Sequence, residues 1–148
     1  MNILAIGSSG FLNWIDKLNN EEQLVKAQAG HHDKIPALMA NGDYNCVMVE
    51  FRGHNRLEIK TLNSLKRLRG DFVIVGVMRN EIIGLRFQAL GEGADICLCR
   101  HGSMADFIET LVSIVPFMIR KKDSETNRQI SETNLDSAEP PHLGRRLH

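Results

Sequence analysis

Hydrophobic residues gather in short runs along the chain, and turn-rich breaks followed by segments with helical spacing separate each run from the next. Buried strands of a parallel sheet are apolar on both faces, so the runs predict strands and the intervening segments predict helices. This alternation is typical of helices packed around a parallel sheet. The expected strands cover residues 2–6, 24–29, 45–50, 72–78 and 95–99, of which 24–29 is the weakest and is expected at an edge.

The predicted helices carry apolar residues three and four positions apart. Phe11, Trp14 and Ile15 show this spacing after the first strand, and Asp33 offers an N-cap to a short second helix with Pro36 in its first turn. The same spacing continues in the later segments, which supports helices between all the predicted strands. The remaining positions are Leu18, Ile59, Leu62, Leu65, Leu68, Ile83, Phe87, Leu90, Phe107, Ile108, Leu111, Val112 and Val115.

The composition changes at residue 121, after which apolar residues become rare. Such a segment cannot bury enough surface to offset its ordering entropy, so we expect a disordered tail or linker over 121–148. The peptide Ser-Glu-Thr-Asn occurs at 124–127 and again at 131–134, which is also compatible with coincidence or with a solvated helical extension. One globular domain is expected over residues 1–120.

The overall charge gives no sign of a nucleic-acid or membrane surface, because 18 basic residues balance 18 acidic ones. No apolar run approaches the roughly 20 residues that a spanning helix requires. The first predicted strand begins at residue 2, which leaves no room for a secretion signal. We therefore expect a cytoplasmic protein that does not contact membranes.

Metal binding is not expected. The three cysteines lie in apolar runs and should be buried, reduced thiols. Cys97 and Cys99 share one face of a strand, but no second Cys/His pair completes a site. His54 and His101, on loops near Glu50, form another conceivable ligand set, although loop histidines are usually plain surface residues.

The ends of the predicted strands carry few reactive groups. Ligands of such sheets bind beyond the carboxyl ends of the strands, where this chain places Gly7, Ser8, Glu50, Val77 and Arg100. These residues include neither a carboxylate pair nor a nucleophile with an adjacent base. The turn at 7–10 also lacks the spacing of a phosphate-binding glycine motif. We therefore expect no enzymatic activity and no cofactor.

Three strings resemble the receiver domain of two-component response regulators: residues 2–6 as the first strand, 44–50 as the central one, and Gly-Glu-Gly-Ala-Asp at 91–95 before the last. The Gly-Ala-Asp sequence is the most specific of them. The resemblance covers about residues 1–120. It implies an α/β, flavodoxin-like (βα)5 three-layer sandwich, with a central five-stranded parallel sheet in the order 2-1-3-4-5.

Receiver chemistry uses an acidic pair that holds Mg²⁺, a phosphate-accepting Asp, a Thr or Ser, and a Lys-Pro. At the matching positions this chain has Gly7 and Ser8 for the pair, Glu50 for the Asp, Val77 for the hydroxyl and Arg100 for the Lys. A divalent cation held by one Glu should bind weakly, and phosphoryl transfer depends on that cation. The resemblance therefore implies a degenerate, phosphorylation-independent pseudo-receiver.

Glu50 and Arg100 admit two interpretations. A guanidinium at the end of the fifth strand could hold the longer Glu side chain in a bidentate pair and so imitate an activated receiver. Alternatively, both side chains simply face solvent at the mouth of an unused crevice, where ion pairs contribute little.

The resemblance also implies how such a domain acts. Receiver-like domains bind protein partners and form homodimers through their fourth helix, fifth strand and fifth helix, where Arg79, Arg86, Asp95 and Asp106 would supply polar contacts. We expect the regulatory part of an atypical response regulator, which would reach DNA only through an output domain absent here. The alternatives are a stand-alone adaptor of a two-component pathway, or a small flavodoxin-like ligand-binding domain or enzyme.

Overall fold

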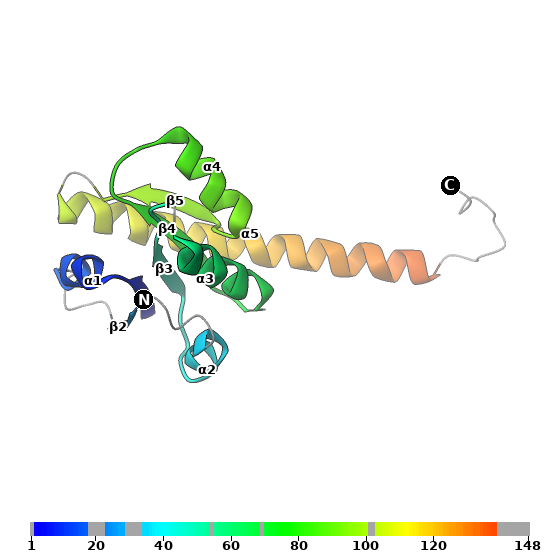
Figure 1. The fold of residues 1–148 in the computed structure, drawn as a ribbon. Helices are drawn as coiled ribbons and strands as arrows, with labels where there is room; N and C mark the ends of the chain where they lie inside the picture. The colour runs from blue at the N-terminus through cyan, green and yellow to red at the C-terminus, as the bar shows by residue number, and fades with distance from the viewer. Residues whose placement is uncertain are drawn as a thin grey trace.

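Five parallel strands form one sheet at the centre of the domain (Figure 1). The computed structural model describes residues 2–17, 23–28, 34–53, 55–68, 70–100 and 103–138, with side chains left out over 23–28 and 123–138. The predicted α/β class with a parallel sheet is confirmed. The sheet order is β2-β1-β3-β4-β5, and the strands are β1 (Asn2–Gly7), β2 (Gln23–Gln28), β3 (Cys46–Glu50), β4 (Val73–Met78) and β5 (Ile96–Cys99).

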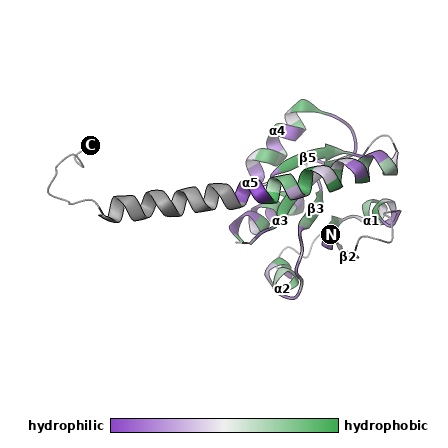
Figure 2. Ribbon diagram, turned by 180° about the vertical axis from the view of Figure 1, so that it is seen from behind, coloured by the Kyte–Doolittle hydropathy of each residue, from purple (hydrophilic) through white to green (hydrophobic). Residues whose placement is uncertain are grey.

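Helices cover both faces of the sheet and give the domain three layers (Figures 1 and 2). One apolar core lies between the sheet and the helices α1 and α5, and the other lies between the sheet and α2, α3 and α4. The helices are α1 (Ser9–Ile15), α2 (Ile35–Ala40), α3 (Arg56–Arg67), α4 (Ile83–Glu92) and α5 (Met104–Ala138).

The two cores follow from the two-residue period of a strand. In β1, Ile3 and Ala5 point into one core, while Leu4 and Ile6 point into the other, and none of the four is more than 3% exposed. Each large apolar side chain buried in this way stabilises the fold by roughly 1.5–3 kcal/mol. Continuous apolar runs therefore become the interior strands of the sheet, as the sequence pattern predicts.

The helix α4 turns most of its large apolar residues away from the sheet. Its inner face holds Ala89, which is buried, and Leu85, which packs against the core, and a Cβ placed on Gly76 of β4 would lie 3.5 Å from the Ala89 Cβ. By contrast, Ile83 and Phe87 are 69% and 67% exposed. The helical spacing of these apolar positions therefore marks an outward face in α4 rather than a buried one.

The helix α5 is much longer than the sequence pattern predicts, since it continues to Ala138 and extends beyond the sheet (Figure 1). The expectation of a disordered tail is therefore wrong over 121–138, and residues 139–148 lie outside the described part. The scarcity of apolar residues argues against packing but not against helix, because residues such as Lys, Glu, Gln and Arg have high helix propensity. Extending an anchored helix also requires no new nucleation.

Some predictions fall outside the described residues. These concern the apolar position Leu18, the N-cap Asp33, and the two histidines His54 and His101. Within the described part of the chain, no helix combines the length and the hydropathy that crossing a bilayer would require.

Candidate functional site

A crevice of about 200 Å³ opens at the carboxyl ends of β1, β3, β4 and β5. Its position is set by the parallel sheet, since all four strands end at the same edge. Four of the five predicted strand-end positions line this crevice, and Gly7 precedes the first of them. The lining residues are Ser8, Gly10, Phe11, Glu50, Arg52, Val77, Arg79 and Arg100.

The position that would carry the first acidic residue of a receiver has no room for a side chain. A Cβ on Gly7 would lie 2.4 Å from Cδ2 of Phe11 and 2.9 Å from the Cβ of Glu50. Because the Phe11 ring is fully buried, it cannot move aside cheaply. The Phe11 ring therefore leaves no space for a carboxylate side chain at position 7.

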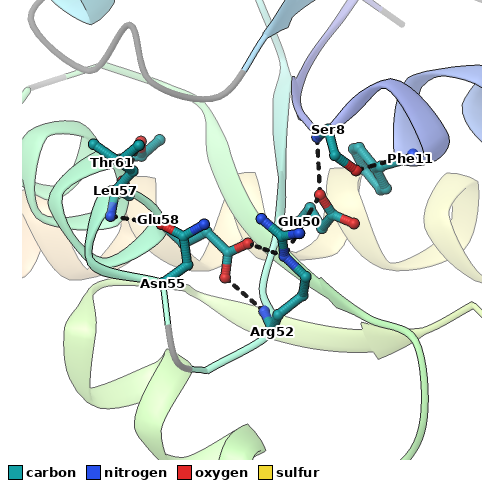
Figure 3. A network of polar contacts seen from close by, with 8 residues as sticks. All are labelled: Ser8, Phe11, Glu50, Arg52, Asn55, Leu57, Glu58 and Thr61. Atoms are coloured by element: carbon teal, nitrogen blue, oxygen red, sulfur yellow. Dashed lines mark hydrogen bonds and ion pairs between the residues drawn. The ribbon is translucent and has the colours of Figure 1, made fainter.

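Glu50 at the end of β3 is held inside the chain. Its Oε1 accepts the backbone N–H of Ser8 at 2.9 Å, and the Arg52 Nε lies 4.0 Å away (Figure 3). Only 12% of the Glu50 side chain is exposed. The bidentate pair between Glu50 and Arg100 does not form in the described structure, where these nearer groups are the partners of Glu50.

Arg52 is anchored by a second carboxylate, that of Glu58 in the first turn of α3 (Figure 3). One oxygen of Glu58 accepts the backbone N–H of Arg52 at 2.6 Å, and the other accepts the Arg52 Nε at 2.7 Å. The hydrogen bond to Glu58 raises the pKa of the Arg52 guanidinium. Glu58 is only 2% exposed, so this network joins the β3 loop rigidly to α3.

Two further guanidinium groups border the crevice. The Arg100 guanidinium carbon lies 5.3 Å from the centroid of the Trp14 ring, and its Nη1 is buried without a hydrogen-bond partner among the described residues. Arg79, just beyond β4, is exposed. Beside them Val77 is buried at 1% exposure and offers no hydroxyl.

The crevice is therefore positively charged where a receiver site is negatively charged. It is lined by three guanidinium groups and a single carboxylate, that of Glu50. No cluster of three potential metal ligands occurs among the residues that the structure describes. Repulsion from the guanidinium groups and the lack of paired carboxylates both disfavour a divalent cation in the crevice.

The four predicted interface residues have different environments. Arg86 binds both oxygens of Glu81, at 2.9 and 2.7 Å, and donates from Nη1 to the Cys97 carbonyl at 2.6 Å. Asp95 accepts the N–H of Ile74 at 2.7 Å and pairs with Lys122 at 2.7 Å. Both therefore hold elements of the domain together.

The other two predicted interface residues are exposed, but in different places. Arg79 lies at the crevice, whereas Asp106 lies in the first turn of α5. Six large apolar residues that were not predicted to be exposed lie at the start of α4, on α4 and on α5. They are Ile82, Ile83, Phe87, Leu90, Val112 and Phe117, all more than a third exposed.

Sequence reasoning missed the roles of Phe11, Arg52 and Glu58. One local signal for Glu58 was present: Asn55 caps α3 by accepting the Leu57 N–H, and Glu58 follows it by three residues. This is the spacing of a capping box, in which the acidic side chain reaches back to a backbone N–H before the helix. Here Glu58 reaches further back, to Arg52.

No protein-family model matches the sequence, and neither does any curated protein. Solved structures do match. A CheY-like receiver domain protein from Methanospirillum hungatei is 14% identical with a TM-score of 0.64, and the match covers 82% of this chain and 97% of that one. A response regulator from Burkholderia pseudomallei, solved with a phosphorylated aspartic acid and a calcium ion, is 18% identical with a TM-score of 0.58, covering 90% and 85%.

NtrX from Brucella abortus, solved with ADP, is 15% identical with a TM-score of 0.67, and the match covers 84% of this chain but only 29% of NtrX. At these identities the similarity shows the fold alone. The chain therefore has the flavodoxin-like fold of receiver domains, as the sequence predicts.

Proposed function

We propose that this chain is a signalling domain with the receiver fold that works without phosphorylation and acts through protein-protein contacts. One observation carries the proposal: three guanidinium groups and a buried phenylalanine occupy the crevice where receiver chemistry requires acidic residues around a metal ion. Phosphoryl transfer to a carboxylate needs a cation that neutralises the developing charge. Without it, Glu50 would remain a structural acceptor for the Ser8 N–H.

Intact-mass analysis after incubation with a small phosphodonor and Mg²⁺ tests the proposal. We expect no added phosphoryl mass on the protein, and none on Glu50→Asp, because restoring the acceptor does not restore the metal site. A receiver domain with the full acidic set, treated in the same tube, is the positive control. Covalent phosphate on the unaltered chain would overturn the proposal.

The proposed contact surface is the α4–β5–α5 side of the domain. Exposed apolar residues on α4 and α5 support it, because large apolar side chains left at the surface commonly mark protein-protein interfaces. The partner that we propose is a second copy of the chain, which would make the domain a homodimer. Asp106 would lie at this surface, whereas Arg86 and Asp95 would support it from within.

We further propose that the domain regulates transcription through an output domain, by analogy with response regulators. A stand-alone adaptor is the alternative. The coding sequence after residue 148 distinguishes the two: a helix-turn-helix region supports an output domain, whereas a stop codon supports the adaptor.

A further inference from the structure

The Arg100 side chain is left with an unsatisfied charged donor at the crevice. Its Nη1 is buried and has no hydrogen-bond acceptor among the described residues. The ring of Trp14, 5.3 Å from the guanidinium carbon, orients the group but replaces no acceptor. Because buried polar groups in proteins are nearly always hydrogen-bonded, an orphan donor on a side chain that lines a cavity indicates a missing acceptor.

The surroundings of this donor favour an anion. Arg52 and Arg79 line the same crevice. Among the described lining residues the one carboxylate is that of Glu50, which is already engaged by the Ser8 N–H and lies near Arg52. Glu58 engages the Nε of Arg52 and so fixes that side chain at the edge of the cavity. Because Glu58 also balances Arg52, three guanidinium groups stand against two carboxylates, and the crevice keeps an excess of one positive charge.

We propose that this crevice binds a small phosphate group, noncovalently and without a metal ion. Guanidinium groups match the geometry of phosphate oxygens, and they keep their charge at every physiological pH. The cavity of about 200 Å³ is smaller than the roughly 300–1,000 Å³ of sites for drug-sized ligands, so it suits inorganic phosphate or a small phosphomonoester. Arg79 and Arg100, which form no ion pair among the described residues, supply the two guanidinium groups that complement the negative charge of a phosphate.

This inference does not depend on the signalling role. A noncovalent phosphate needs neither a phosphate-accepting carboxylate nor Mg²⁺, and it dissociates when the protein is denatured for mass analysis. A failure of the anion site therefore leaves the proposed function intact. Conversely, covalent phosphate would overturn the proposed function without testing noncovalent binding.

Isothermal titration calorimetry tests the site directly, with a chelator present and with chloride holding the ionic strength constant. The probes are inorganic phosphate and glycerol 3-phosphate. We expect saturable binding that weakens at least tenfold in Arg100→Gln and severalfold in Arg79→Gln. Glu50→Gln should bind more tightly, because it removes a negative charge and keeps an acceptor for the Ser8 N–H.

The matched control is Arg67→Gln, which removes the same charge from an exposed position at the other end of α3. Its affinity should stay within twofold of the unaltered protein. Similar affinities for the two probes identify inorganic phosphate as sufficient, whereas tighter binding of glycerol 3-phosphate identifies a phosphorylated small molecule.

Three results would overturn the site: no saturation above the chloride background, equal losses in Arg100→Gln and Arg67→Gln, or binding that requires Mg²⁺. If Arg100→Gln does not fold, Arg79→Gln and Glu50→Gln still decide the question, because they predict opposite changes in affinity.

Discussion

The crevice and the outer face of α4 both lie at the surface, but they differ in how far their side chains are engaged by the rest of the chain. In the crevice, Glu50 and Arg52 bind groups of the chain itself, and Glu58 secures Arg52. On α4, Ile83 and Phe87 are more than two-thirds exposed. Glu50 and Arg52 are thus engaged within the chain, whereas Ile83 and Phe87 of α4 are left exposed to solvent.

This contrast separates two properties of the fold. Catalysis needs reactive groups that are placed but free to react, whereas the Glu50 carboxylate is engaged by the Ser8 N–H and lies near Arg52. Binding needs apolar surface that association can bury, and α4 retains it. Under the proposed function, such a domain would offer a contact surface without carrying out phosphoryl transfer.

The largest effect on stability should come from restoring an acidic residue at position 7. Gly7→Asp would drive a Cβ into Phe11 and add a carboxylate beside Glu50, and overpacking alone typically costs about 1–3 kcal/mol. We expect the free energy of unfolding, measured by urea denaturation, to fall by at least about 2 kcal/mol.

Gly10→Ala is the matched control for that variant. A Cβ at Gly10 would approach nothing closer than the Ser8 Oγ, at 4.0 Å. Replacing Gly by Ala in a helix is favourable by about 0.5–1 kcal/mol, so this variant should be as stable as the parent or more so. If Gly7→Asp were equally stable and gained affinity for Mg²⁺, the crevice would be a receiver site lacking one residue.

A smaller loss is expected from Glu58→Ala, which removes the buried anchor of Arg52. The backbone N–H of Arg52 would lose its acceptor, and an unsatisfied group of this kind costs about 1–3 kcal/mol. Urea denaturation should show a loss in that range.

The control is Glu81→Ala, which breaks a pair between Arg86 and a carboxylate that is 45% exposed. Exposed ion pairs contribute roughly 0–1 kcal/mol, so the loss of stability in Glu81→Ala should be clearly smaller than that in Glu58→Ala. Equal losses in the two variants would show that the crevice network is no stronger than a surface ion pair.

The fold was predictable because each buried strand corresponds to a short run of consecutive apolar residues in the sequence. Runs such as 72–78 stay apolar on both faces of the sheet, and their short length favours a buried strand over a buried helix. The end of α5 was not predictable on the same basis, because a solvated helix and a disordered tail share a polar composition. The outward face of α4 was missed because helical spacing identifies a stripe without saying what covers it.

The site was predictable only where the backbone fixes it. The sequence placed Ser8, Glu50, Val77 and Arg100 at the strand ends, and the structure brings these residues to one crevice. The partners of Glu50 were not predictable, because they depend on side-chain directions. The network through Arg52 depends on a helix turn that brings Glu58 back toward β3, and spacing alone only hints at that turn.

The Cys97 thiol of β5 lies against α4, where it donates to the Arg86 carbonyl at 3.7 Å, and its titration makes the stability of the domain depend on pH. Burial raises the pKa of the Cys97 thiol to about 11 from an ordinary 9.0, with smaller and opposing effects of Arg86 and Glu81. The folded protein therefore keeps a proton that the unfolded chain releases between about pH 9 and 11. The free energy of unfolding should fall as pH rises through that window, and the contribution of Cys97 is complete below pH 9.

Urea denaturation at pH 8 and pH 10.5 measures this loss, with Cys97→Ala as the comparison. The variant should lose less stability between the two pH values, because it has no thiol to titrate at this position. Burial also raises the pKa of Cys46. Because Cys46 is present in both proteins, its contribution to the pH dependence is the same in both. An identical loss in the two proteins would mean that α4 does not shield β5 from water.

The smallest effect on folding should come from substitutions on the outer face of α4. For these variants, the quantity to measure is the strength of dimerisation. Ile83→Ser with Phe87→Ser removes two side chains that are 69% and 67% exposed, so the free energy of unfolding should change by no more than about 0.5 kcal/mol. Sedimentation velocity should nevertheless show at least tenfold weaker dimerisation, because this apolar surface would be buried between copies. Lys60→Ser, at an exposed position of α3, should change neither quantity. Unchanged dimerisation in the double variant would remove α4 from the interface, whereas a large loss of stability would mean that these side chains pack within the chain.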